Sequence, residues 1–444
     1  MTLEEHIKRH AALCHDKTAV VAPDARLSYG QLWQAVEERA ARLREEHGGR
    51  VVVVRSSQTA AFLVEYFAIH AAGKIAVPLE RDVPGAVADG VREQLAALER
   101  DATDAIPADV ADILFTTGTT GKAKGVMISS ATIVADAENL IDAQKYSSSL
   151  TFIVSGPLNH IGSLSKVYPV MCLGATLHVT EGMRDMNTFF SAIDAAEGKV
   201  ATFLVPASIR MLMEFGEDAM RRRADKIDFI ETGAAPMALA DMQRLCALLP
   251  ESRLYNTYAS TETGIVATFD FNAGECIAGC LGKPMRHSRI AISPDGHISC
   301  SGKTLMTGYV GDPYLTSSVL YDGSVHTADL GFFDSEGRLR LSGRDDDVIN
   351  VGGYKVAPTE VEDAAMASPM VADCVCLPAQ HPVLGTVLRL LIVLADGFCL
   401  DKRQLALCIR GRLEAYKVPV YYGCVEQIRR TYNGKIDRKA YSND

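Results

Sequence analysis

The 444-residue sequence lacks three features that would place it in a familiar class of protein. The N-terminus has no apolar signal-like segment, and no long uncharged apolar run follows it. Both absences argue against secretion and against a membrane-spanning helix. Basic residues are outnumbered 45 to 55, and the formal net charge of −10 argues against non-specific binding of nucleic acid. We therefore expect a soluble, cytoplasmic protein with neither a nucleic-acid nor a membrane partner.

The cysteines also lack a recognisable framework for a metal or for disulfides. There are 11 of them, scattered along the chain, and the closest pairs are Cys276 with Cys280 and Cys374 with Cys376. No second cluster completes a tetrahedral metal site. Cys374 and Cys376 lie in the strand-like run 371–377, where residues two apart share one face. Buried, reduced thiols in a cytosolic protein explain this pattern better than zinc or disulfides.

The length and the apolar content predict more than one domain. A chain of 444 residues, 48% hydrophobic, exceeds the size at which a single core usually divides. Strand-like and helix-like patterns alternate along it, which is typical of parallel βαβ units. We expect strands at residues 18–21, 51–54, 75–78, 112–115, 151–154, 175–179, 201–205, 228–233 and 253–258. We expect helices at 32–43, with Ser28 and Gln31 as a capping box, and at 59–70, 163–173, 183–197, 206–215 and 237–249.

The pattern changes in the last third of the chain. Residues 282–308 read as short strands separated by turns, which favours a β-rich subdomain. After residues 343–347 the pattern restarts as strand, helix, strand, strand, helix. We predict an α/β fold with a large N-terminal domain of parallel sheets layered with helices, residues 1–345, and a small, mobile α+β domain, residues 346–444.

A glycine- and threonine-rich segment, residues 116–125, reads T-T-G-T-T-G-K-A-K-G between two apolar segments. Glycines permit close backbone approach, and successive N–H groups can form an anion-binding nest. This is not a Walker A loop, because Ala123 follows the lysine and Thr116 replaces the first glycine. A flexible polar loop is the alternative, but the density of hydroxyls and lysines favours phosphate binding.

The loop resembles the signature of the adenylate-forming superfamily, which comprises acyl- and aryl-CoA synthetases, luciferases and peptide-synthetase adenylation domains. Ala123 replaces the usual proline. Further resemblances follow in the family's order over nearly the whole chain: G-A-A-P at 233–236, Y-N-T-Y-A-S-T-E-T-G at 255–264, T-A-D-L-G at 327–331 and T-Y-N-G-K-I-D-R at 431–438. Ala259 and Ala328 stand where the family has glycine, and the segment 80–111 is shorter than usual.

The resemblance implies a site for ATP and magnesium. Tyr258 is expected to stack on adenine, Asp329 to accept from the ribose hydroxyls and Glu262 to hold Mg²⁺. The catalytic residues implied are Lys435, Glu262, Thr261 and His160. The implied ATP contacts are Thr116, Thr117, Gly118, Thr119, Thr120, Gly121, Lys124, Gly233, Ala234, Ala235, Pro236, Asn256, Tyr258, Asp329 and Arg344. Taken singly, each has a structural explanation, such as an ordinary turn or a surface salt bridge.

The resemblance also bears on the two other substrates, the acid and the thiol. Peptide-synthetase domains hold an amino group with an aspartate where this chain has Ile161, so an amino acid is not the expected substrate. The acid pocket is expected at His160, Ile161, Gly233 and Ala259. The thiol tunnel is expected at Gly352, Gly353 and Lys355, with Asp346 as the hinge.

Three functions remain open at this point. The first is activation of an aryl or short-to-medium acyl carboxylic acid and its transfer to coenzyme A. The second is transfer to the phosphopantetheine of an acyl carrier protein, and the third is a non-catalytic nucleotide-binding relative. Retention of Lys435, Glu262, Asp329 and Arg344 argues against the third.

Overall fold

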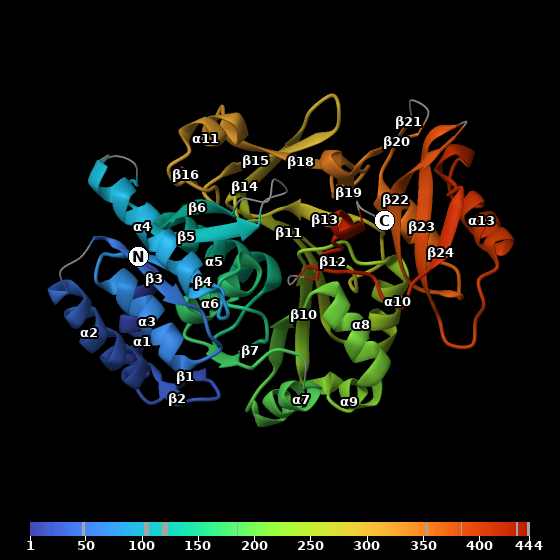
Figure 1. The fold of residues 1–444 in the computed structure, drawn as a ribbon. Coiled ribbons are helices and arrows are strands. Elements are labelled where there is room, and N and C mark those ends of the chain that lie inside the picture. The colour runs from blue at the N-terminus through green and yellow to red at the C-terminus, as the bar shows by residue number, and fades with distance from the viewer. Residues whose placement is uncertain are drawn as a thin grey trace.

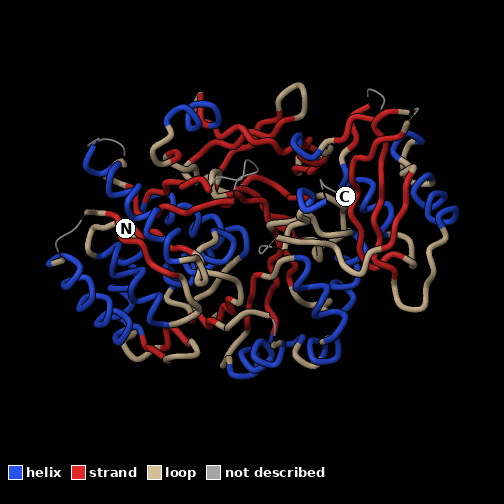
Figure 2. The backbone as a smooth tube through the Cα atoms, viewed as in Figure 1, coloured by secondary structure: helices blue, strands red, loops and turns tan. Residues whose placement is uncertain are grey.

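The chain folds into a large N-terminal part and a smaller C-terminal part, which lie side by side in Figure 1. The computed structural model describes residues 1–444 except 47–48, 102–105, 118–122, 184, 352–353, 383, 432–433 and 442–444. Helices surround the strands of the large part and also lie between its two sheets (Figure 2). The predicted α/β class, with its β-rich subdomain and small C-terminal α+β domain, is confirmed.

The larger sheet combines a parallel half with an antiparallel half. Its strands are β1 (Thr18–Val21), β2 (Arg26–Ser28), β7 (Thr151–Val154), β8 (Thr176–Val179), β9 (Val200–Phe203), β10 (Ile227–Gly233), β11 (Arg253–Ser260), β12 (Gly264–Asp270), β13 (Cys280–Pro284), β14 (Ser288–Ile292), β15 (His297–Gly302), β17 (Leu320–Tyr321), β18 (Ser324–Phe333) and β19 (Leu339–Arg344). They run in the order β14-β15-β18-β19-β13-β12-β11-β10-β9-β7-β8-β1-β2, with β17 beside β18. Neighbours from β1 to β11 are parallel, as predicted, and β2 is an additional antiparallel strand.

The smaller sheet carries the glycine-rich segment. Its strands are β3 (Val51–Arg55), β4 (Ile75–Leu79), β5 (Val110–Thr117), β6 (Ala123–Ser129) and β16 (Gly308–Tyr309), in the order β16-β6-β5-β4-β3. Strands β3 to β5 are parallel, which confirms the predicted βαβ unit, whereas β5 and β6 form an antiparallel hairpin. The sequence pattern of residues 51–54 favours a buried strand, but β3 is an edge strand and is only half-buried.

The helices form three layers around these sheets. Helices α1 (Leu3–Leu13), α2 (Tyr29–Glu45), α3 (Ala60–Ala71), α5 (Ser130–Gln144) and α6 (Ile161–Leu173) share one core with both sheets. Helices α7 (Met186–Ala195), α8 (Pro206–Phe215), α9 (Glu217–Arg221) and α10 (Leu239–Leu248) cover the other face of the larger sheet. Helix α4 (Gly85–Asp101) packs on the smaller sheet, and α11 (Pro313–Val319) lies beside β16. Within the described residues, none of the helices has the length and apolarity needed to cross a membrane.

Local sequence signals explain where several helices begin and end. Ser28 caps α2, and its side chain and that of Gln31 form the predicted capping box. Gly174 ends α6 with φ 71°, a left-handed conformation that glycine adopts without strain. Helix α6 begins at Ile161, two residues before the predicted start, and α7 is shorter at both ends than predicted.

The C-terminal part has a hydrophobic core of its own. It contains β20 (Ile349–Val351), β21 (Tyr354–Val356), α12 (Pro358–Met366), β22 (Val371–His381), β23 (Gly385–Leu394), α13 (Lys402–Arg410) and β24 (Tyr421–Cys424). Strands β21 and β24 were missing from the predicted order, because both are short. Cys374 and Cys376 are buried in this core, and all 11 cysteines are free thiols. The boundary between residues 345 and 346 stays a prediction.

A buried charge network fixes the strand that leads into the glycine-rich segment. His70 in α3 contacts Glu4 and Asp112, each at 3.0 Å, and the Tyr66 hydroxyl donates to Asp112 at 2.7 Å. Burial alone would lower the pKa of His70, but the two carboxylates outweigh it and raise the pKa to about 10. A charged His70 therefore ties α1 and α3 to β5 below that pH.

Candidate active site

The described ends of the glycine-rich segment lie in the paired strands β5 and β6. Thr116 pairs with Lys124 and Thr117 pairs with Ala123 in an antiparallel register. Gly118, Thr119, Thr120 and Gly121 lie outside the described residues, and their predicted phosphate contacts stay predictions. The Lys124 ammonium lies 5.6 Å from the centre of the Tyr309 ring.

Glu262 lies in the turn between β11 and β12, next to Thr261. Its carboxylate accepts a hydrogen bond of 2.9 Å from the Tyr309 hydroxyl. Its backbone carbonyl accepts another from the amide of Met306 at 2.9 Å. Tyr309 thus bridges Lys124 and Glu262, although it belongs to a different segment of the chain from either. The sequence reasoning missed Tyr309, which no nearby motif identifies.

Asp136 supports the same turn from inside the protein. One of its carboxylate oxygens accepts from the amide of Ile265 at 2.8 Å, and the other has no hydrogen-bond partner among the described residues. Burial raises the pKa of Asp136 to about 8, so the carboxyl is protonated at neutral pH. Gly264 has φ 67°, and a Cβ there would lie 2.6 Å from Asp136, so the turn fits only glycine.

Three of the predicted ATP-binding residues meet on strands β11, β18 and β19 of the larger sheet. The Tyr258 hydroxyl donates to Asp329 at 2.7 Å, and the Arg344 guanidinium lies 3.3 Å from the other oxygen of the same carboxylate. Asp329 and Arg344 are also directly opposite each other in the β18–β19 ladder. The structure therefore brings together an aromatic ring, a carboxylate and a guanidinium from three motifs.

The predicted adenine-binding turn, residues 233–236, follows β10. Ala234 has φ 66°, which costs about 1 kcal/mol in a residue other than glycine. A Cβ on Gly233 would lie 2.8 Å from the carbonyl oxygen of Thr257, so the two strands approach closely there. Asn256, predicted to contact ATP, is buried, and its amide donates to the carbonyl of Cys280 at 3.0 Å. This contact gives Asn256 a structural role.

Lys435 reaches this group of residues from the C-terminal part. Its side chain keeps contact with solvent, but the surrounding protein lowers the pKa of the ammonium, and the Arg344 guanidinium acts in the same direction. The charges of Asp329 and Glu262 oppose that shift. Burial, together with the charge of Lys435, also lowers the pKa of His160. Lys435 is therefore close enough to residues of four predicted motifs to interact with their charges.

The segment that carries Lys435 is held by its own backbone and by a buried ion pair. The amide of Thr431 donates to the carbonyl of Lys435 at 2.7 Å. Arg438, three residues further on, donates to both carboxylate oxygens of Glu362 in α12, at 2.7 and 2.8 Å. Both bonds come from one nitrogen of the guanidinium and are charge-assisted, so Arg438 anchors the segment to the C-terminal core.

Phe203, which the sequence reasoning missed, lies close to Gly233, one of the residues predicted for the acid pocket. Ile161, Phe203 and Ala259 are half-buried against the same core. A Cβ on Gly162 would lie 3.3 Å from the Phe203 ring, and one on Gly233 would lie 3.7 Å from it. The Phe203 ring therefore lies between the start of α6 and the end of β10. His160 caps α6 at this point, and its Nε2 lies 3.4 Å from the side-chain nitrogen of Asn159.

A buried ion pair lies behind this ring. Lys166 and Glu231 are 1% and 0% exposed, and the ammonium lies 2.7 Å from the carboxylate and 5.0 Å from the centre of the Phe203 ring. The second Glu231 oxygen has no hydrogen-bond partner among the described residues. Part of the signal was available in the sequence, because Lys166 is the one charged residue of the apolar helix α6.

The predicted hinge and thiol tunnel are only partly described. Residues 345–347 form a turn of 3₁₀ helix directly after β19, with Asp346 at its centre. Gly343 before it packs against the C-terminal part, since a Cβ there would lie 2.8 Å from Cβ of Ala357. Gly352 and Gly353 lie outside the described residues, and Lys355 is described only in its backbone, which pairs with Asn350. The described part of the chain contains no group of three or more His, Cys, Asp or Glu suited to a metal ion.

Comparisons with known proteins match nearly the whole chain. The sequence matches the family described as AMP-binding enzyme over residues 7–99 and 86–310, and the AMP-binding enzyme C-terminal domain over residues 360–435. It is 28% identical to an indoleacetate–CoA ligase of Aromatoleum aromaticum, covering 98% of this chain and 96% of that protein. It is 26% identical to a feruloyl-CoA synthase of Amycolatopsis, covering 96% of each chain.

Solved structures share the fold. The o-succinylbenzoate CoA synthetase of Bacillus subtilis, in complex with its acyl-adenylate intermediate, matches with a TM-score of 0.83 and 21% identity over 99% of this chain and 98% of that one. ATP-bound MatB from Rhodopseudomonas palustris matches with a TM-score of 0.84 and 21% identity over 100% of this chain and 99% of that one.

Proposed function

Because the chain belongs to the AMP-binding enzyme family, we propose that it is an acid–thiol ligase that activates a carboxylic acid with ATP and transfers the acyl group to coenzyme A. The observation that carries this proposal is the contact of Tyr258 and Arg344 with one carboxylate, that of Asp329. The charges of Arg344, Asp329 and Glu262 also act on the pKa of Lys435. Similarity to characterised CoA ligases along nearly the whole chain supports it.

The two steps assign distinct tasks to these residues. A carboxylate oxygen attacks the α-phosphorus, the bond to the bridging oxygen breaks, and pyrophosphate leaves with that electron pair. Lys435 and the N–H and hydroxyl donors proposed for the glycine-rich segment stabilise the charge that develops on the phosphoryl oxygens. The thiolate sulfur then attacks the acyl carbon, and AMP leaves. Asp329 and Arg344 are proposed to hold the ribose through both steps.

Glu262 fits the binding of magnesium. Mg²⁺ prefers one or two carboxylates together with phosphate oxygens and water, and it needs no all-protein cage. Glu262 offers a half-buried carboxylate oriented by Tyr309, whose ring also lies near Lys124 of the glycine-rich segment that we propose binds the phosphates. When bound, the metal would neutralise charge on the phosphate oxygens. Glu262 would hold it, and Thr261 would contact the α-phosphate.

Replacing Tyr309 by phenylalanine tests this support of Glu262. The Glu262 carboxylate would lose the hydrogen bond that orients it. We therefore expect the Mg²⁺ concentration for half-maximal pyrophosphate exchange to rise about tenfold. Tyr314→Phe is the matched control, because Tyr314 is 85% exposed on the neighbouring helix α11. An unchanged magnesium dependence in Tyr309→Phe would contradict the role given to the hydroxyl.

An exchange assay over a panel of acids tests the function itself. Carboxylate-dependent exchange of pyrophosphate into ATP reports the first step alone. Ile161, Phe203 and Ala259 present apolar surface, so we expect the strongest exchange with aryl or short-to-medium acyl acids that lack an α-amino group. An amino acid giving the strongest signal would refute the assignment of Ile161. Absence of exchange with every acid would favour a non-catalytic nucleotide-binding relative.

The acceptor and the domain motion complete the proposal. Comparing free coenzyme A with a phosphopantetheine-bearing carrier protein, in an assay of thioester formation, distinguishes the two acceptors. We propose that residues 346–444 move relative to residues 1–345 between the two steps, with Asp346 as hinge, and that Gly352, Gly353 and Lys355 then line the thiol tunnel. The cytoplasmic location stays a prediction.

A further inference from the structure

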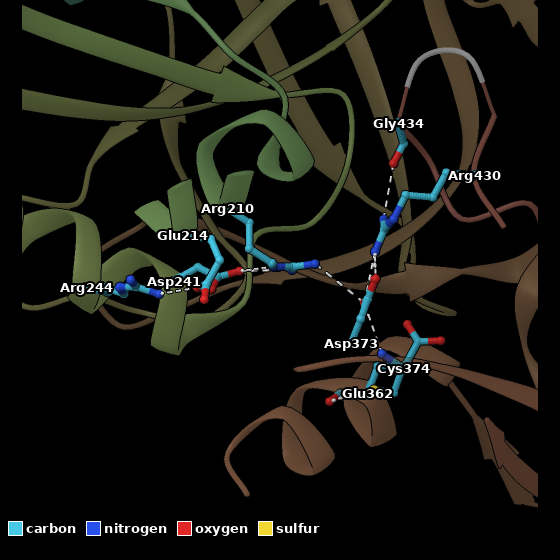
Figure 3. A network of polar contacts seen from close by, with 9 residues as sticks. All are labelled: Arg210, Glu214, Asp241, Arg244, Glu362, Asp373, Cys374, Arg430 and Gly434. Atoms are coloured by element: carbon cyan, nitrogen blue, oxygen red, sulfur yellow. Dashed lines mark hydrogen bonds and ion pairs between the residues drawn. The ribbon is translucent and has the colours of Figure 1, made fainter. Parts of the chain in front are cut away.

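A chain of ion pairs joins the N-terminal part to the segment that carries Lys435 (Figure 3). It begins at Arg210 in α8, whose guanidinium donates to Asp241 of α10 at 3.1 and 2.9 Å. A third nitrogen of the same guanidinium lies 3.5 Å from Asp373 at the start of β22. Arg210 is therefore shared between a carboxylate of its own part and one of the C-terminal part.

Asp373 also contacts Arg430, which lies in the segment that carries Lys435. Its two carboxylate oxygens accept from Arg430 at 2.9 and 2.7 Å, and the amide of Cys374 donates to it at 2.9 Å. Arg430 in turn donates to the carbonyl of Gly434 at 3.2 Å. Gly434 directly precedes Lys435. A single side chain, that of Arg430, therefore links the Asp373 carboxylate to the segment that carries the lysine.

The surroundings make this contact stronger than an ordinary surface salt bridge. Arg210 and Asp373 are 26% and 21% exposed, so solvent screens them only in part. Burial alone would lower the pKa of Arg210, but Asp241 and Asp373 together raise it above its ordinary value. The backbone at Gly434 also lies close to the N-terminal part here, because a Cβ on Gly434 would lie 3.2 Å from the side chain of Val205, the N-cap residue of α8.

We propose that Arg210 and Asp373 are positioning residues that hold the Lys435 segment in the pose used for adenylate formation. This inference rests on the proposed function, since it takes Lys435 as the lysine that acts in the first step. Arg210 fixes Asp373, Asp373 orients Arg430, and Arg430 sets the position of Gly434. The pair acts only while the two parts are docked in this way, so thioester formation from a finished acyl-adenylate does not need it.

Arg210→Met is the direct test of the pair. Methionine keeps an unbranched side chain of comparable length but removes the charge. We expect the maximal rate of pyrophosphate exchange to fall about tenfold, the size of effect that losing a charge-assisted hydrogen bond produces. Coenzyme A-dependent thioester formation from supplied acyl-adenylate should stay at the wild-type rate.

Arg244→Met is the matched control, and Asp373→Asn tests the pair from the other side. Arg244 lies in the neighbouring helix α10, and its partners Glu214 and Glu217 both belong to the N-terminal part. We expect Arg244→Met to keep wild-type exchange. Asp373→Asn should lower exchange as Arg210→Met does, and it serves as the test if Arg210→Met fails to fold.

The double variant shows whether the two residues act through each other. If they do, the fold-loss in exchange rate of the Arg210→Met, Asp373→Asn double variant is much smaller than the product of the fold-losses of the two single variants. Multiplicative losses, or equal losses in both half-reactions, overturn the proposal. Wild-type exchange in both single variants also overturns it. If wild-type protein shows no exchange with any acid, the proposed function itself fails.

Discussion

Lys435→Ala is expected to lower carboxylate-dependent pyrophosphate exchange by about 100-fold to 1,000-fold, the loss seen when one transition-state donor is removed. The reason is electrostatic. The charges of Arg344, Asp329 and Glu262 act on the pKa of the Lys435 ammonium, and these residues belong to the site where we propose that the α-phosphate is attacked.

The second half-reaction supplies the internal control. Thioester formation from supplied acyl-adenylate should change less than about threefold in Lys435→Ala, because the C-terminal part is proposed to have moved Lys435 away by then. Lys439→Ala is a matched control, since Lys439 lies on the adjacent 3₁₀ turn (Arg438–Tyr441) and is exposed. Equal losses in the two half-reactions would show that Lys435 acts on the fold or on both steps.

Asp346→Pro should preserve pyrophosphate exchange and impair thioester formation, which is the opposite of the result expected for Lys435→Ala. Proline locks φ near −65° and removes the backbone N–H, whereas a hinge residue must absorb a large change in backbone angles. With the enzyme held in the pose observed here, pyrophosphate exchange should stay within about threefold of wild type, and thioester formation should fall by about 100-fold. The measurement is single-turnover kinetics of each step.

Asp346→Ala separates the backbone effect from loss of the side chain. Alanine leaves φ free and keeps the N–H, so it should form thioester at nearly the wild-type rate. Thioester formation at the wild-type rate in Asp346→Pro would show that the hinge lies elsewhere or that one pose serves both steps. Comparison with Arg210→Met is informative, because that variant should impair the half-reaction that Asp346→Pro preserves.

The elements that were predicted well are those whose signals are local. Ser28 and Gln31 determine the start of α2, and Gly174 determines the end of α6, because caps act over three or four residues. The alternation of strands and helices predicted the parallel half of the larger sheet for the same reason. The family could also be identified from sequence, since its motifs are contiguous segments that occur in a fixed order.

Only the tertiary structure shows which residues of distant segments contact one another. Tyr309 meets Glu262 across 47 positions, and Lys166 meets Glu231 across 65. Neither residue of the Arg210–Asp373 pair lies in a motif, so nothing near either one in sequence identifies the other. Such contacts depend on how layers and domains pack. A short segment of sequence contains no information about that packing. The sequence alone therefore determined the fold class and the family and predicted the site residues, whereas the tertiary structure decided which charged side chains meet, including Arg210 and Asp373.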